Sequence, residues 1–384
     1  MTEKILRLIL ISAVIFSFAS SSFASEASEA VNNFAFNAGK IIMSDSEGSF
    51  FFSPFSIITA FGMAYAGASG DTAREIESSL GINQGIHESL GELARDIDGS
   101  GCMSSANRVW LKNGISLRKD YADILRADYD GGVKNISMNE KSRVEINKWT
   151  SQKTNGKIND LLQTLDPCTR MIITNAVYFR AEWSKKFPKS ATKNEKFYVG
   201  GTSKDVPMMK QRGDFSYCES DGVKMIELPY DGGRFSMIAA LPPKENPDAL
   251  KDFDAGKFSE CLDSMKVYDV DLRLPKFKTE KKYGLKKVFE ALGIRLAFTD
   301  NADFSGITAD ERLKADEVIH QSFIDIDEEK TEAAAATAVI MMKATAMPKR
   351  RPYAEFHADH PFMYFIRDNE TGTILFMGYQ NFAE

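Results

Sequence analysis

Residues Glu328–Met347, EEKTEAAAATAVIMMKATAM, decide how the rest of the sequence is interpreted. Local propensity favours a helix, because Glu, Lys, Ala and Met are strong helix formers. A period of two fits as well, since one strand face would carry only small or apolar residues: Thr331, Ala333, Ala335, Thr337, Val339 and Met341. A segment that suits both an exposed loop and a buried strand is a candidate bistable element. Taken alone, the stretch favours an amphipathic surface helix, so the rest of the sequence is needed to choose between this helix and the bistable element.

The whole chain has the composition of a globular protein. It has 384 residues, of which 43% are hydrophobic and 27% charged, and its formal net charge is -6. This balance argues against a broad basic surface for nucleic acid, so the expected partners are proteins or small molecules. Length alone allows two or three domains, but no Pro-, Gly- or Ser-rich linker divides the chain. We expect one domain over residues 25–384.

The first residues have the pattern of a secretory signal peptide. Lys4 and Arg7 precede an apolar run at 8–18, and small residues follow up to Ala24. The apolar run is about half of the roughly 20 residues that a membrane span needs. We expect residues 1–24 to be removed and the mature protein to be extracellular, or periplasmic in a bacterium, without a membrane anchor.

Residues that carry catalytic or metal chemistry are scarce. The four cysteines and four histidines show no zinc-site spacing, and the sequence lacks GxSxG, GxxxxGK[ST] and GxGxxG motifs. We therefore expect no enzyme, no cofactor and no metal, and the cysteine pairing stays open. The acidic run Asp325, Asp327, Glu328 and Glu329 is interpreted as a solvated strand edge rather than a calcium or acid–base site.

The order of the expected elements indicates an α+β fold. Helical patterns come first, at 71–80 with a capping box between Thr72 and Glu75, at 118–129, and at 141–163 with an interruption at Asn155-Gly156. Strand patterns dominate after residue 171, including a hairpin of 223–230 with 235–241. A helix at 283–293 and strands at 316–326, 361–367 and 373–379 complete the pattern.

Several motifs together make the chain resemble the serpin family along essentially its whole mature length. They are Phe51-Phe52-Ser53-Pro54-Phe55-Ser56-Ile57, Asn107-Arg108-Val109-Trp110, Ile146-Asn147-Lys148-Trp149, Thr154-Asn155-Gly156-Lys157-Ile158, Thr174-Asn175-Ala176-Val177-Tyr178-Phe179 with Trp183, Leu274-Pro275-Lys276-Phe277, Thr331-Glu332-Ala333-Ala334, Phe356-His357-Ala358-Asp359-His360-Pro361-Phe362 and Phe376-Met377-Gly378. No single motif suffices, but their order and spacing are specific.

The resemblance implies three β-sheets, about nine helices and an exposed reactive loop at about 328–352. In inhibitory serpins a serine protease attacks this loop and forms an acyl-enzyme. The cleaved loop then enters the large sheet as a new strand, which traps the protease before the ester hydrolyses. The protein would thus be a suicide substrate in a kinetically trapped native state. It would act as a monomer prone to loop-into-sheet polymers, with cysteine proteases as a further target class.

The family pattern also assigns roles to residues. Ser53, Ser56, Asn175 and His320 match the shutter, a polar cluster beneath the opening sheet, and Trp183, Lys276 and Glu328 match the breach, where insertion begins. An exported hydrolase using Ser53 and His320 is the less favoured alternative. The hinge comprises Glu328, Glu329, Lys330, Thr331, Glu332, Ala333, Ala334, Ala335 and Ala336. Lys330 replaces the usual glycine, which supports a non-inhibitory serpin as a second alternative.

The scissile bond determines the target, and counting places it in more than one way. Counting from Glu328 gives Ala344-Thr345, which suits elastase-like or subtilisin-like proteases with small apolar pockets. A shift of one residue presents Lys343 to trypsin-like enzymes. Counting back from Pro361 gives Arg350, and Met347 is another candidate.

Overall fold

The computed structural model describes residues 26–45, 48–331 and 351–382. The predicted signal peptide, the hinge beyond Thr331 and the candidate scissile bonds at Lys343, Ala344, Met347 and Arg350 all lie outside these residues. None of the helices in the described ranges is long and apolar enough to cross a membrane.

Most of the helices precede the long central strands, as the sequence predicts. Residues 26–45 are helical, and seven α-helices lie wholly within the described residues. These are α2 (Pro54–Tyr65), α3 (Gly70–Leu80), α4 (Ile86–Gly99), α5 (Lys119–Asp128), α6 (Glu140–Lys153), α7 (Ala255–Ser264) and α8 (Lys286–Leu292). Three short 3-10 helices lie at Lys189–Ala191, Pro247–Leu250 and Leu296–Phe298.

Sixteen strands form two hydrogen-bonded networks within the described residues. The seven-stranded one has the order β3 (Val133–Ile136), β2 (Met103–Lys112), β4 (Met171–Phe179), β12 (Glu317–Ile326), β13 (Lys330–Thr331) and β5 (Ala181–Glu182), with β11 (Phe277–Gly284) also on β12. The nine-stranded one has the order β1 (Phe50–Phe52), β16 (Ile374–Gln380), β15 (Phe362–Asp368), β9 (Phe235–Leu241), β8 (Val223–Pro229), β7 (Thr202–Ser220), β10 (Lys266–Pro275) and β14 (Tyr353–His357), with β6 (Lys193–Val199) on β7.

The long strand β7 explains why three expected sheets appear as two networks. Its first part pairs with β6, its middle with β10 and its last residues with β8. Because β7 pairs with β6 and β10 on one part of its length and with β8 on another, two of the three expected sheets are joined into the nine-stranded network. The α+β fold class predicted from the sequence is confirmed.

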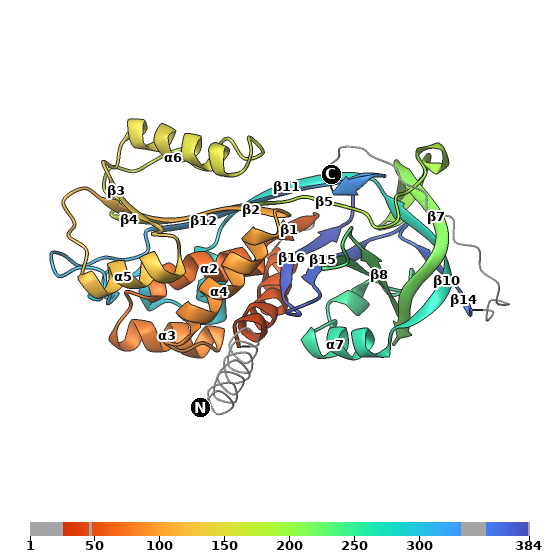
Figure 1. Cartoon of the computed structure of the whole chain (residues 1–384), viewed down its shortest axis with the longest axis horizontal. Helices are drawn as coiled ribbons and strands as arrows, with labels where there is room; N and C mark the ends of the chain where they lie inside the picture. The colour runs from red at the N-terminus through yellow and green to blue at the C-terminus, as the bar shows by residue number, and fades with distance from the viewer. Residues whose placement is uncertain (1–25, 46–47, 332–350, 383–384) are drawn as a thin grey trace, which may run out of the picture.

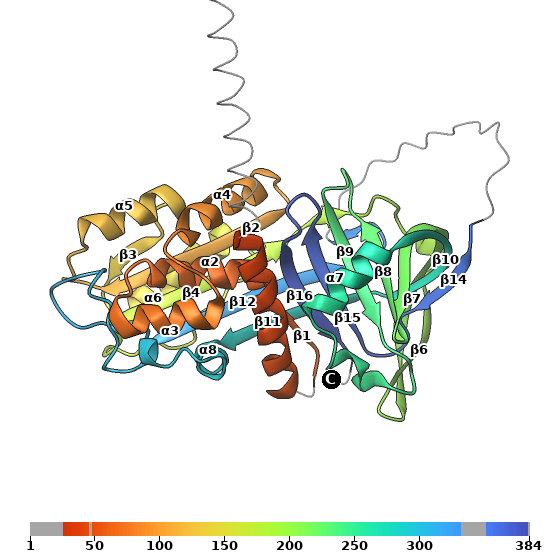
Figure 2. The ribbon, with the colours of Figure 1, turned by 90° about the horizontal axis from the view of Figure 1, so that it is seen from below.

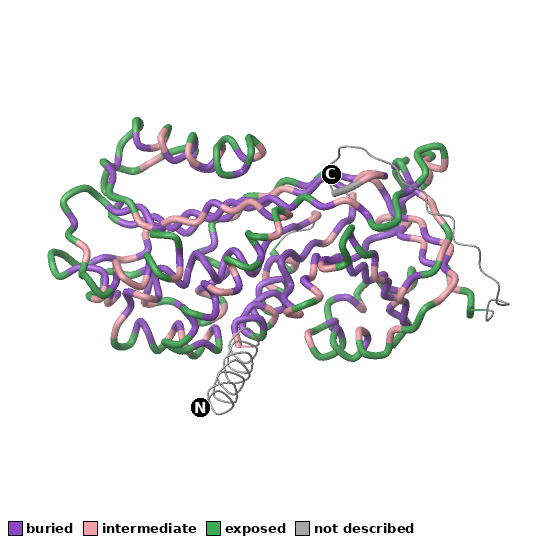
Figure 3. The backbone as a smooth tube through the Cα atoms, in the orientation of Figure 1, coloured by how far each residue is buried: buried purple, intermediate pink, exposed green. Residues whose placement is uncertain are grey.

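The helices lie on both faces of the seven-stranded sheet. In Figure 1, α6 covers one face, while α2, α3, α4 and α5 lie against the other. Figure 2 shows the nine-stranded network beside this helical half, with α7 packed on it. Buried residues follow the strands through the centre of the molecule (Figure 3). A small cluster around Trp110 and Ile146 packs under α6, and the main core fills the space on the other face.

Two helix boundaries test the local predictions. The expected helix at 141–163 ends at Lys153, because Asn155 and Gly156 have positive φ angles of 51° and 75°. The capping box at the start of α3 is wrong, since the helix begins at Gly70 after Ser69. Glu75 instead accepts hydrogen bonds from the backbone N–H groups of Arg295 and Leu296, so a distant loop takes the carboxylate that would have closed the box.

The structure also supplies the cysteine pairing that the sequence leaves open. Cys218 in β7 and Cys261 in α7 form a disulfide, with Cα atoms 6.1 Å apart. Cys102 is a half-buried free thiol and Cys168 an exposed one. The disulfide ties α7 to the sheet behind it.

Candidate functional site

The four predicted shutter residues lie together at the point where α2 meets the seven-stranded sheet. Ser53 is the N-cap of α2 and accepts a hydrogen bond from the Ser56 N–H, while Pro54 occupies the first helical turn. Asn175 in β4 and His320 in β12 are direct partners in the parallel pairing of these strands. All four side chains are fully buried.

His320 holds the two strands and the helix together as a neutral ring. Its Nε2 accepts a hydrogen bond of 3.1 Å from the Ser53 N–H, which requires the ring proton on Nδ1. That Nδ1–H donates to the side-chain oxygen of Asn175. Burial lowers the pKa of His320 to about 3, so the ring is uncharged at neutral pH.

Asn107 of β2 is a member of this network that sequence reasoning missed. The Asn175 amide donates to the Ser56 carbonyl at 3.0 Å and to the side-chain oxygen of Asn107. The Ser56 hydroxyl also donates to that Asn107 oxygen, at 3.2 Å. Asn107 stood within a quoted motif, and its signal is the register that places it directly opposite Asn175.

The geometry does not support the hydrolase alternative. The Ser53 hydroxyl donates to the Leu375 carbonyl at 2.6 Å, and His320 contacts the Ser53 backbone rather than its hydroxyl. A nucleophile needs a base on its own proton and a path for substrate, and neither is present at this buried serine. The cluster therefore connects backbone segments.

The three predicted breach residues lie at the far end of β12. The Lys276 ammonium lies 2.9 Å from the Glu328 carboxylate, which is 7% exposed. Burial opposes the charge of Glu328, but its hydrogen bonds, that from Lys276 being the largest, together with the Lys276 charge lower the pKa of the carboxyl below its usual value. The Trp183 indole N–H donates to the Asp327 carbonyl at 2.8 Å, and its ring stacks on Tyr230 with centroids 4.6 Å apart.

The residues of the acidic run at this end all have ion-pair or hydrogen-bond partners. Asp325 pairs with Lys278 at 2.7 Å and Glu329 with Lys189 at 2.5 Å, while Asp327 accepts the Glu329 N–H at 2.9 Å. Across the described ranges, no group of three or more His, Cys, Asp or Glu side chains is placed to hold a metal ion. The expected solvated strand edge is therefore wrong in part, because Asp325 and Glu328 are buried and β12 is paired with β11 and β13 at this end.

The sheet is split at the breach and closed below it. Strand β13 lies between β12 and β5, since Thr331 is opposite Ile326 on one side and Ala181 on the other. Below the split, β4 and β12 pair directly in parallel from Glu317↔Ile172 to Phe323↔Tyr178. The Lys157 ammonium sits 5.7 Å and 5.6 Å from the ring centroids of Tyr178 and Phe323, above the last closed pair.

Lys330 occupies this split in an extended backbone conformation. It belongs to β13 and pairs with Glu182, and it is not among the described non-glycine residues with positive φ. A residue with a β-carbon adopts such a conformation without strain. The uncleaved fold therefore does not require the glycine that the family usually has here.

The comparisons with known proteins agree with this architecture. The family model described as serpin (serine protease inhibitor) matches residues 29–381. An uncharacterised serpin-like protein of Thermococcus kodakarensis is 41% identical over 361 residues, covering 91% of this chain and 84% of that protein. Iris of Ixodes ricinus is 39% identical, covering 87% of this chain and 92% of that protein.

Solved structures agree as well. A crystal structure of maspin superimposes with a TM-score of 0.86 at 26% identity, covering 94% of this chain and 99% of that one. A crystal structure of uncleaved ovalbumin gives a TM-score of 0.81 at 27% identity, covering 92% of this chain and 99% of that one. The chain therefore belongs to the serpin family, whose model carries the description serine protease inhibitor.

Proposed function

We propose that this protein is a secreted suicide-substrate inhibitor of serine proteases, which traps the acyl-enzyme by inserting its cleaved reactive loop into the seven-stranded sheet. The observation that carries the proposal is the position of β13. It already lies between β12 and β5, and its antiparallel direction along β12 leads toward the closed pair of β4 and β12.

The register of β13 specifies where an inserted strand would lie. Thr331 is opposite Ile326 and Ala181, and an antiparallel strand continues this pairing one residue at a time. On that register Glu332–Ile340 would run beside β12, and Ala333–Met341 beside the whole of β4. The proposed strand therefore matches the length of the two strands that it would separate.

The same register sorts the side chains to the two faces. Residues that share the face of Ile324 and Ile326, both fully buried, would be Ala333, Ala335, Thr337, Val339 and Met341. Ala333 and Ala335 are small, so they would pass the core without steric clashes. Glu332 would point to the opposite face, which α6 covers in Figure 1.

The inserted strand would meet the shutter at one position. Thr337 would lie between Asn175 and His320, the residues that pair across β4 and β12 in the closed sheet. Val339 would then lie between Ile173 and Val318, both in the main core. Each large apolar side chain buried in this way contributes roughly 1.5–3 kcal/mol, so the cleaved form would be the more stable one.

The target class follows from the end of the inserted strand. Met341 would be opposite Met171, the first residue of β4, so the Ala344-Thr345 bond lies just beyond the strand. Cleavage there favours elastase-like or subtilisin-like proteases, with cysteine proteases as a further class and trypsin-like enzymes the alternative if Lys343 or Arg350 is recognised. The Cys218–Cys261 disulfide supports export, because disulfides persist in oxidising compartments.

Trapping is tested by incubating the mature protein separately with elastase, subtilisin and trypsin. The expected result is a covalent complex that survives denaturing electrophoresis, together with a released fragment that begins at Thr345 by intact mass. A fragment beginning at Ala344 or Arg351 would assign a trypsin-like target. Cleavage between 343 and 351 without any complex would make the non-inhibitory alternative, a protease substrate or binding protein, the better description.

The register is tested with Thr337→Arg, using Thr337→Ser as the matched control. An arginine placed beside the buried His320 blocks insertion, so this variant should be cleaved at the normal rate without forming the complex. The serine variant should trap normally. Full complex formation by Thr337→Arg would refute the proposed register.

A further inference from the structure

Strand β2 has an edge that is only partly covered. Strand β3 pairs with Val109–Lys112 alone, so residues 103–108 have β4 as their only strand neighbour among the described residues. Val109 donates its N–H to Gly132 on the open side, whereas Lys112 donates to Arg170 on the β4 side. Because successive residues alternate in direction, Met103, Ser105 and Asn107 present their backbone N–H and C=O groups at the open edge.

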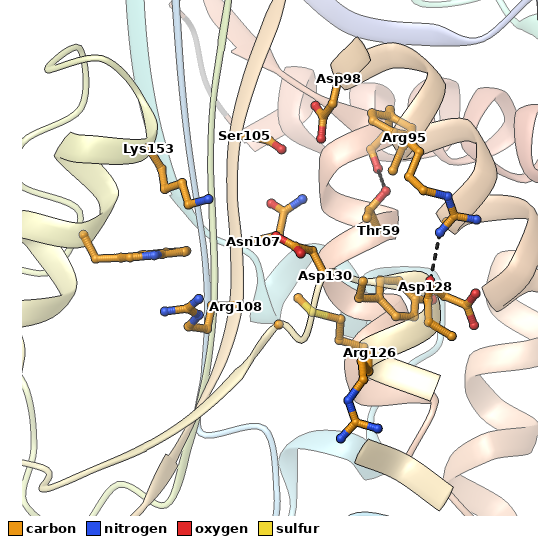
Figure 4. Close-up of a pocket in the computed structure, with 18 residues that line it drawn as sticks. Thr59, Arg95, Asp98, Ser105, Asn107, Arg108, Arg126, Asp128, Asp130 and Lys153 are labelled. Carbon is orange, nitrogen blue, oxygen red and sulfur yellow. Dashed lines mark hydrogen bonds between the residues drawn. The ribbon is translucent and has the colours of Figure 1, made fainter. Parts of the chain in front are cut away.

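A cavity of about 410 Å³ lies beside this edge. Ser105 and Asn107 line it, together with the apolar side chains of Phe55, Met63 and Trp149. Figure 4 shows side chains entering this space from both faces of the sheet. There is therefore room for another chain next to unpaired backbone groups.

Opposite charges line the two sides of the edge. Arg108 and Lys153 lie on the α6 side, whereas Asp98, Asp128, Asp130, Arg95 and Arg126 lie on the side of α4 (Figure 4). Arg126 pairs with Asp123 and Arg95 interacts with Asp128, which leaves Arg108, Lys153, Asp98 and Asp130. None of the four forms an ion pair with another described residue, although 26 such pairs are found elsewhere in these ranges. The four charges are thus unpaired within one cavity.

The four charges differ in their contact with water, since Arg108 is half-buried whereas Asp98, Asp130 and Lys153 are exposed residues. The Arg108 guanidinium lies 4.3 Å from the Trp149 ring centroid, and its buried Nε has no hydrogen-bond partner. Although Asp98 is an exposed residue, partial desolvation of its carboxyl group and the nearby Asp130 charge raise its pKa to about 6, and Lys153 opposes the shift. The half-buried Arg108 therefore gains most from a partner of opposite sign, and the three exposed charges gain less.

We propose that the open edge of β2 docks an extended segment of another protein that carries an acidic and a basic side chain at consecutive positions. Such a segment adds a strand next to Ser105 and Asn107 and hydrogen-bonds with their backbone groups. Successive side chains of a strand point to opposite faces of a sheet. The acidic one therefore reaches Arg108 and Lys153, and the basic one reaches Asp98 and Asp130.

Two capped, fluorescein-labelled peptides of identical composition test the pattern. TVEKVT places its charges on opposite faces of a strand, whereas TEVKVT places both on one face. Fluorescence anisotropy with the mature protein should show that TVEKVT binds about three- to tenfold more tightly, as expected for the loss of one or two charge pairs of which only that of Arg108 is half-buried. Equal affinities would overturn the proposal, and so would competition by the free dipeptide EK at a similar affinity, because a dipeptide cannot form the strand pairing.

Variants of the protein test the edge itself. Lys153→Glu should weaken TVEKVT binding about three- to tenfold, whereas Lys141→Glu, in the same helix α6 but outside the cavity, should not. Ser105→Pro removes a backbone N–H at an edge where proline is tolerated, and it should also weaken binding. If Lys153→Glu leaves the affinity for TVEKVT unchanged, the proposal is wrong. It is also wrong if the mature protein self-associates and Ser105→Pro abolishes this self-association, because the open edge would then bind a second copy of the chain.

Discussion

The Lys276–Glu328 ion pair provides the sharpest test of how the reactive loop is kept out of the sheet. Glu328→Gln removes the charge and keeps the shape of a side chain that is 9% exposed. A buried hydrogen bond to a charged group contributes about 1.5–3 kcal/mol, and the lower end applies here because the Lys276 side chain retains 39% of its exposure and therefore its water. A loss of about 1.5 kcal/mol in the uncleaved form corresponds to about tenfold faster conversion to inserted or polymeric forms.

The assay follows the disappearance of uncleaved monomer on native gels at a fixed raised temperature. Lys278→Gln is the matched control, because the Lys278–Asp325 pair joins β11 to β12 and these strands stay paired when β4 and β12 separate. It should cost stability without faster conversion. If Glu328→Gln converts no faster than the unaltered protein, or if both variants accelerate equally, the ion pair does not hold the loop out.

Three further predictions concern stability and the hinge. His320 has a folded pKa of about 3, below the ordinary value of about 6.5, so the stability it contributes is present above pH 6.5 and is lost as the pH falls, with a cost of about 2 kcal/mol at pH 5. Burial also lowers the pKa of His87, to about 4, and this shift has the same effect on stability. The free energy of unfolding by denaturant should therefore be measured between pH 7.5 and 5 in a His87→Gln background. A free energy that does not change with pH in this variant would contradict the lowered pKa of His320. The Cys218–Cys261 disulfide closes a separation of 43 residues, and replacing both cysteines with serine should cost about 4 kcal/mol in thermal unfolding, whereas Cys102→Ser should change little. Because Lys330 is already extended in β13, Lys330→Gly should lower the stability of the uncleaved protein by about 0.5–1 kcal/mol and leave the yield of protease complex unchanged. A large increase in that yield would instead identify Lys330 as the residue that limits insertion.

Part of the order of helices and strands could be predicted from local signals, whereas α2, α4 and the central strand β2 were not among the expected elements. The hairpin of β8 and β9 follows from two apolar runs around Asp231-Gly232-Gly233, and the end of α6 follows from Asn155-Gly156. The residues of the shutter and the breach could be placed only through the family resemblance. Their positions depend on pairing between β4 and β12, which are more than a hundred residues apart in the chain, and local patterns carry no such information.

Tertiary contacts decided the features that sequence reasoning missed. Asn107 has no special local pattern, and its part in the polar network arises from its register with Asn175. The capping box at Thr72 and Glu75 failed because the backbone of Arg295 and Leu296 binds the carboxylate more favourably. The pairing of Cys218 with Cys261 likewise requires β7 and α7 to be packed together first.

The position of Trp183 has a practical consequence for following this protein in solution. Only three tryptophans are present in the chain. Trp110 of β2 and Trp149 of α6 pack against each other, whereas Trp183 stacks on Tyr230 and donates a hydrogen bond to the Asp327 carbonyl immediately before the hinge. Indole emission depends on ring stacking and on the hydrogen bond of the N–H, so replacing Trp110 and Trp149 with phenylalanine would leave a single intrinsic fluorophore at the entrance of the sheet. Stopped-flow fluorescence of that variant would time the entry of the loop without any attached dye.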